Sequence, residues 1–168
     1  SGYSGPMTKL AESVVKKAIE TNTVIATAES CTGGLIAAAL TDIAGSSAVF
    51  DRGFVTYSNE AKADLLGVPI HHTESPGAVS ALVAEEMVLG ALVRSKANLA
   101  VAVTGIAGPG GSTDEKPVGL VYIAIRAGST PVVVKECRFA ETDGAESRKD
   151  VRRLTVKTAL EMLLEAMG

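Results

Sequence analysis

Hydrophobic and polar residues follow two different periods along the chain, and each period predicts a different element. In residues 8–20, apolar side chains recur every three or four positions, which predicts an amphipathic helix. The short runs 23–27 and 99–103 are rich in apolar and β-branched residues, which is typical of strands covered on both faces. The sequence therefore predicts helices packed on a buried sheet.

The same patterns cover the rest of the chain. Further helices are expected at residues 35–43, 60–66, 80–95 and 145–167. Further strands are expected at residues 49–57, 118–126 and 132–139. The last two strands form an antiparallel hairpin around Gly128 and Ser129. This order predicts an α/β fold, a three-layer α/β/α sandwich around a mixed, mostly parallel five-stranded sheet.

The composition agrees with one domain of this kind. Of the 168 residues, 46% are hydrophobic and only 4% are aromatic, so the core must consist mainly of Ala, Val, Leu and Ile. Residues 1–7 include a Gly- and Ser-rich stretch, and we expect an added or disordered leading segment there. Residues 8–168 are then expected to form a single domain.

Charge and cysteine spacing exclude several classes of protein. A formal net charge of −3 offers no general attraction for nucleic acid. No apolar run approaches the roughly 18 residues that span a bilayer, so we expect a cytoplasmic protein without membrane contact. Cys31 and Cys137 lie far apart without C-x-x-C spacing, which argues against a zinc site or a disulfide framework.

Three polar segments follow predicted strands. They are residues 28–34, 57–62 and 104–111. Ligands of open α/β sheets collect outside the carboxyl ends of the strands, so we expect these segments to meet at one edge of the sheet.

Ser30 and Lys62 are the candidate catalytic pair in these segments. Ser30 lies in a strand-to-helix turn, where main-chain N–H groups face incoming negative charge; the alternative is that Ser30 or Thr32 simply caps the helix. Lys62 lies in the first turn of a predicted helix, where the macrodipole disfavours a cation. Partial burial there would lower its pKa and leave an amine able to deprotonate a serine; the alternative is a solvated surface lysine.

Other polar residues are candidates for supporting roles. Tyr57 precedes the Lys62 helix, and the segment from Thr104 and Gly105 to residue 111 offers main-chain donors without a Walker A pattern. Arg148 and Arg152 are four residues apart on one helix face and could clamp a phosphate or simply face solvent.

Two other kinds of catalytic group find less support. Cys31 could replace Ser30 as nucleophile, but no histidine follows it at a recognisable spacing. The two histidines, His71 and His72, sit together in one loop, which gives little support to a histidine triad or metal motif.

Several motifs together resemble the competence/damage-inducible CinA C-terminal domain family. They are residues 28–34, 42–47, 53–62, 104–109, 116–119 and 151–153, so the resemblance runs from about Thr8 to the end. It implies an anticodon-binding-domain-like sandwich and a nicotinamide mononucleotide deamidase of the PncC type, with no metal and no cofactor. It also implies Ser30 as nucleophile, Lys62 as base, Tyr57 as an assistant, and Thr104 and Arg148 as substrate contacts.

The function expected from these residues is hydrolysis of an amide through an acyl-enzyme on Ser30. Besides Thr104, Gly105 and Arg148, the turn residues Thr32, Gly33 and Gly34 are expected to contact the nucleotide substrate. Two alternatives stay open: a nucleotide-binding regulatory module without turnover, and a hydrolase of a different amide. The Ala- and Val-rich helices make a homo-oligomer such as a symmetric dimer a reasonable expectation.

Overall fold

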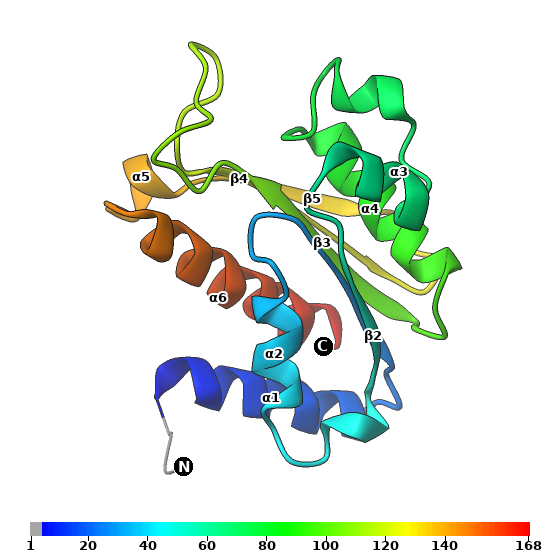
Figure 1. Cartoon of the computed structure of the whole chain (residues 1–168). Helices are drawn as coiled ribbons and strands as arrows, with labels where there is room; N and C mark the ends of the chain where they lie inside the picture. The colour runs from blue at the N-terminus through cyan, green and yellow to red at the C-terminus, as the bar shows by residue number, and fades with distance from the viewer. Residues whose placement is uncertain (1–4) are drawn as a thin grey trace.

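The centre of the fold is a five-stranded mixed sheet in the order β2-β1-β3-β4-β5 (Figure 1). The computed structural model describes residues 5–168. The strands are β1 Ile25–Glu29, β2 Phe50–Val55, β3 Leu99–Gly105, β4 Leu120–Ala127 and β5 Val133–Arg138. β1 pairs in parallel with β2 and β3, whereas β4 is antiparallel to β3 and β5. Every strand except β4 therefore runs in the same direction, which confirms the predicted mixed, mostly parallel sheet.

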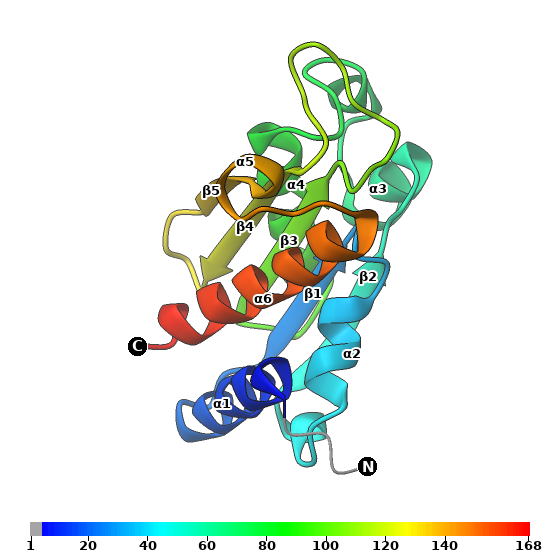
Figure 2. The same ribbon diagram turned by 90° about the vertical axis from the view of Figure 1, so that its left-hand side faces the viewer.

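Helices cover both faces of this sheet and complete the predicted three layers. One face carries α1 Pro6–Glu20, α2 Leu35–Thr41 and α6 Arg148–Ala166, which pack against one another (Figure 2). The other face carries α3 Asn59–Leu66 and α4 Ala81–Val93 (Figure 1). The short helices η1 Ser46–Ala48, η2 Ile70–Thr73 and α5 Phe139–Thr142 lie in the connections.

The central strand β3 shows how the sequence builds two cores. Successive side chains of a strand point to opposite faces of the sheet. Leu99, Val101 and Val103 pack in the core beneath α1 and α6, whereas Ala100 and Ala102 pack in the core beneath α4. The small alanine side chains leave room for α4 to lie close to the sheet. The larger side chains of β3 fill the core on the opposite face.

The helix boundaries correct the expectations at the start of the chain. α1 begins at Pro6, two residues earlier than predicted, because proline is well suited to the first helical position, where its missing N–H costs nothing. Pro6 and Met7 thus belong to the fold and not to a leading segment. Residues 1–4 of that segment lie outside the described residues.

Strand β1 extends further toward the polar segment than the sequence predicts. It continues to Glu29, two residues beyond the prediction, because Glu29 is still paired with Val55 of β2 and Val103 of β3. The parallel strands β1, β2 and β3 therefore end together at one edge of the sheet. All three predicted polar segments start at this edge.

None of the helices between residues 5 and 168 combines the length and the apolar content that a membrane-spanning helix needs.

Candidate active site

Ser30 and Lys62, 32 positions apart in the sequence, are in direct contact in the fold. Ser30 directly follows β1, and its Oγ lies 3.0 Å from Nζ of Lys62. Lys62 is on α3, whose start is fixed by Ser58 Oγ accepting from Ala61 N–H at 3.0 Å. Only 1% of Lys62 is exposed, so the surface alternative does not hold.

The amine of Lys62 has a complete set of partners. It lies 2.9 Å from the main-chain oxygen of Thr56 and 3.2 Å from that of Tyr57, in addition to Ser30 Oγ. An ammonium donates to all three; a neutral amine donates to the two carbonyls and turns its lone pair toward the Ser30 hydroxyl. Among residues 5–168, no salt bridge involves Lys62. Desolvation by burial accordingly lowers the pKa of Lys62 from its ordinary value of 10.5.

The turn that carries Ser30 is held by a buried carboxylate that the sequence analysis missed. Glu29 is 1% exposed, and its oxygens accept from Thr32 Oγ1 at 2.6 Å and from the N–H groups of Ile36 and Ala37 at 2.9 and 3.0 Å. A carboxylate at a helix N-terminus accepts from main-chain N–H groups that have no partner within the helix, and the positive end of the helix dipole stabilises its charge. Its signal in the sequence is an acidic residue in the turn between a predicted strand and a predicted helix, six residues before Leu35.

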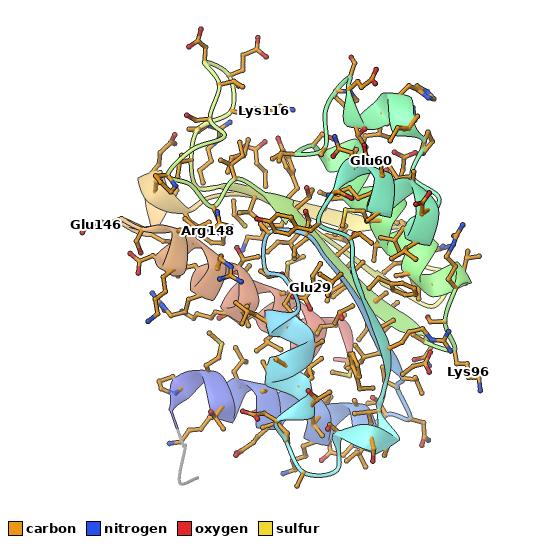
Figure 3. All side chains as sticks on the ribbon, in the orientation of Figure 1. Glu29, Glu60, Lys96, Lys116, Glu146 and Arg148 are labelled. Carbon is orange, nitrogen blue, oxygen red and sulfur yellow. The ribbon has the colours of Figure 1, made fainter. Side chains whose placement is uncertain are left out.

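Replacing Glu29 by glutamine should destabilise the protein by about 1–3 kcal/mol, because an amide NH₂ then faces main-chain N–H donors inside the fold. We also expect a lower kcat, since the neighbouring Ser30 loses its fixed position. Urea unfolding and kcat measurements on Glu29→Gln check both effects. The matched control is Glu60→Gln, an exposed acidic residue in the first turn of α3 (Figure 3). Equal stability of the two variants would contradict the assignment.

Six of the predicted site residues line one pocket with a volume of about 230 Å³. They are Ser30, Lys62, Tyr57, Thr104, Gly105 and Arg148. The other residues of its wall are Cys31, Asn59, Ala78, Val79 and Ala107. The segments predicted to gather at the strand ends thus form one site.

Thr32, Gly33 and Gly34 are not among the described residues that line this pocket. The Thr32 hydroxyl is fully buried and donates to Glu29, and Gly33 N–H donates to Ser30 O at 3.0 Å. Gly33 and Gly34 have φ of +59° and +106°, which lets the turn reverse tightly into α2. In this structure the three residues shape the turn that presents Ser30.

The two arginines considered as a clamp have different positions. Arg148, the first residue of α6, donates from Nη1 to Gly108 O at 2.9 Å and from Nη2 to Tyr57 Oη at 2.8 Å (Figure 3). Arg152 donates from Nε to Cys31 O at 3.0 Å and from Nη2 to Thr32 O at 3.2 Å. Arg148 therefore faces the pocket, whereas Arg152 holds the main chain behind Ser30.

The remaining candidates are defined by their environments. The Thr104 hydroxyl donates to Ala78 O at 2.9 Å, so it fixes the opposite wall of the pocket. Burial raises the pKa of the Cys31 thiol to about 11, which keeps it protonated and weakly nucleophilic at neutral pH.

His72 pairs with Glu86 outside the pocket wall. Within residues 5–168, no three side chains of His, Cys, Asp or Glu form a metal-binding group.

Comparison with known proteins places this geometry in a family. A sequence model described as the CinA C-terminal domain matches residues 7–167. The chain is 46% identical to the nicotinamide-nucleotide amidohydrolase PncC of Escherichia coli strain K12, over 92% of this chain and 91% of that protein. It is 50% identical to a putative competence-damage inducible protein of Acetivibrio thermocellus, over 96% of this chain but only 38% of that longer protein.

Solved structures agree with the sequence comparison. The competence/damage inducible protein CihA from Agrobacterium tumefaciens superposes with a TM-score of 0.91 at 52% identity, with 98% of both chains covered. A CinA superfamily protein from Klebsiella pneumoniae gives a TM-score of 0.89 at 33% identity, with 97% of this chain and 98% of that chain covered. The five strands and all residues of the pocket wall lie within residues 7–167, which the family model matches. The chain belongs to the CinA C-terminal domain family.

Proposed function

We propose that the protein is an amidohydrolase that converts nicotinamide mononucleotide to nicotinic acid mononucleotide and ammonia, in the recycling of pyridine nucleotides. The observation that carries the proposal is the contact between the Ser30 hydroxyl and the buried amine of Lys62 in the wall of an open pocket. A similar protein that covers nearly the same length bears the name nicotinamide-nucleotide amidohydrolase, which supports this choice of substrate.

Acylation of Ser30 is the first chemical step. Neutral Lys62 takes the Ser30 proton while Oγ attacks the carboxamide carbon, so a C–O bond forms and the carbonyl oxygen becomes negative. We assign its stabilisation to Cys31 N–H, because Cys31 follows the nucleophile and lines the pocket. The neighbouring Gly33 N–H is less suitable as a donor, since it already donates to Ser30 O.

Departure of ammonia completes acylation, and deacylation then returns the enzyme to its starting state. The Lys62 ammonium gives its proton to the departing nitrogen, the C–N bond breaks, and ammonia leaves an acyl ester on Ser30. Lys62, neutral again, then takes a proton from water as the water attacks the ester. The Lys62 ammonium returns this proton to Ser30 Oγ as the ester C–O bond breaks, which regenerates the Ser30 hydroxyl and the neutral amine and releases the carboxylic acid.

Tyr57 and Arg148 form the rim on which the substrate is oriented. The Tyr57 hydroxyl accepts from Arg148, and 59% of Tyr57 is exposed, so one face of its ring is free to contact the pyridine. Arg148 also bonds Gly108 O, which connects the rim to the glycine-rich segment after β3. This arrangement places the Tyr57 ring and the Arg148 guanidinium together in the wall of the pocket that holds Ser30.

The test is ammonia release from nicotinamide mononucleotide, nicotinamide riboside and nicotinamide by the purified protein, with chelator present. We expect steady turnover of the mononucleotide and much slower turnover of the other two. Thermal stabilisation by the mononucleotide without ammonia release would favour the binding-module alternative. Faster turnover of another amide would overturn the proposed substrate.

A further inference from the structure

A loop above the pocket carries a cation that the proposed mechanism does not use. Residues 106–119, here called the outer loop, connect β3 to β4 and are closed at their base by Gly119 N–H donating to Ile106 O at 2.8 Å. At the tip, Thr113 N–H donates to Lys116 O at 2.9 Å, and Lys116 N–H donates to Thr113 Oγ1 at 3.0 Å. This closed turn fixes the main chain from which the Lys116 side chain extends.

The Lys116 side chain reaches from the outer loop to the loop that precedes α4 (Figure 3). Its Nζ donates to Pro76 O at 2.6 Å. A Cβ at position 77 would lie 3.1 Å from Nζ, so Gly77 leaves the space that the ammonium occupies. Lys116 thus joins two loops that both contribute residues to the pocket wall.

Within the part of the chain that the structure describes, no acidic side chain pairs with Lys116. Among the salt bridges of residues 5–168, none involves Lys116, although Asp114 and Glu115 precede it. Its one hydrogen-bond acceptor in the described chain is the neutral carbonyl of Pro76. An ammonium has three donors, so two remain for an anionic ligand.

The position of this ammonium fits the outer end of a mononucleotide. Both connected loops contribute to the pocket wall, the outer loop through Ala107 and the other through Ala78 and Val79. Pro76 is two residues before Ala78, and two extended residues span at most about 7 Å. The ammonium therefore lies beyond the residues that line the pocket, and in the proposed pose the ribose phosphate extends from Ser30 toward these two loops.

On the basis of the proposed function, we infer that Lys116 recognises the phosphate of the substrate and determines the preference for the mononucleotide over the riboside. Two free N–H donors of Lys116 bind phosphate oxygens while the third stays on Pro76 O. Arg148 is less free for this role, because its two terminal nitrogens already hold Gly108 and Tyr57. Lys116 is therefore a specificity residue, distant from the bond that reacts.

The test compares kcat/KM for nicotinamide mononucleotide and nicotinamide riboside in the wild type and in Lys116→Ala. We expect the ratio of the two values to fall by on the order of 10- to 100-fold in the variant, as the loss of a charged hydrogen bond predicts. The riboside value itself should change little, and Lys116→Arg should recover part of the ratio. If riboside turnover is too slow to measure, its inhibition constant against the mononucleotide replaces it.

Lys96→Ala is the matched control, because Lys96 is an exposed lysine far from the outer loop (Figure 3). It should leave both substrates unchanged. An unchanged ratio in Lys116→Ala would overturn the phosphate role. If both kcat/KM values fall by the same factor, Lys116 only holds the two loops together. A wild type that releases no ammonia from the mononucleotide would instead remove the proposed function and this inference with it.

Discussion

Replacing Ser30 by alanine is expected to lower ammonia release from nicotinamide mononucleotide by about 10⁴-fold or more, the size of loss seen when a nucleophile is removed from an acyl-transfer site. No other hydroxyl in the pocket contacts the Lys62 amine within the described chain, so nothing replaces the lost Oγ. Turnover is measured with thermal unfolding as a check that the variant is folded. Binding of the mononucleotide should persist, since Oγ contributes little to ground-state binding.

Cys31→Ala is the control for this experiment, because Cys31 is next to Ser30 and lines the same pocket. Burial raises the pKa of its thiol to about 11, so the thiolate is scarce at neutral pH. We expect Cys31→Ala to keep activity within about tenfold of the wild type, with any loss caused by repacking of a small buried side chain. Near-normal turnover by Ser30→Ala, or collapse in Cys31→Ala, would transfer the nucleophile to Cys31.

The layers of the fold were predictable because local patterns and tertiary packing agree. β3 reads as a continuous apolar run since both of its faces are covered, and α1 shows its buried stripe directly in the sequence. The boundaries were less predictable. Glu29 looked like the start of a polar turn, but pairing with two neighbouring strands keeps it in β1.

The site was predictable where a residue conflicts with its local setting. A lysine in the first turn of a helix is unfavourable unless something else requires it, and this conflict pointed to Lys62. The partners of Arg152 and Thr104 could not be predicted, because both side chains bond main-chain oxygens from distant segments. Such contacts depend on the packing of α6 and β3 and leave no periodic signal.

Replacing Lys62 by methionine should lower kcat/KM by about 10²–10⁴-fold, the usual contribution of a general base. Lys62→Arg is the matched control, since arginine keeps the charge but does not lose its proton at accessible pH. We expect both variants to be nearly inactive. An active Lys62→Arg would show that Lys62 acts through its charge alone.

The pH dependence of the wild type should report the same group. Only the neutral amine accepts the Ser30 proton, and burial lowers the pKa of Lys62 below 10.5. kcat/KM should therefore rise with pH through the lowered pKa and level off above it, at a lower pH than an ordinary lysine would require. The residual activity of Lys62→Met should lack this rise. A profile that keeps the rise in the variant would assign it to another group.

Stability should depend on pH for the same reason. Between the lowered pKa and 10.5, the unfolded chain carries a proton on Lys62 that the folded protein has lost. The unfolded state then binds more protons, so the free energy of unfolding contributed by this site rises with pH through that window. Below the lowered pKa both states are protonated, and the cost of burying the ammonium is fully present. Urea unfolding of wild type and Lys62→Met at several pH values should show the wild type gaining stability relative to the variant as pH rises; parallel curves would mean that the Lys62 pKa is not lowered.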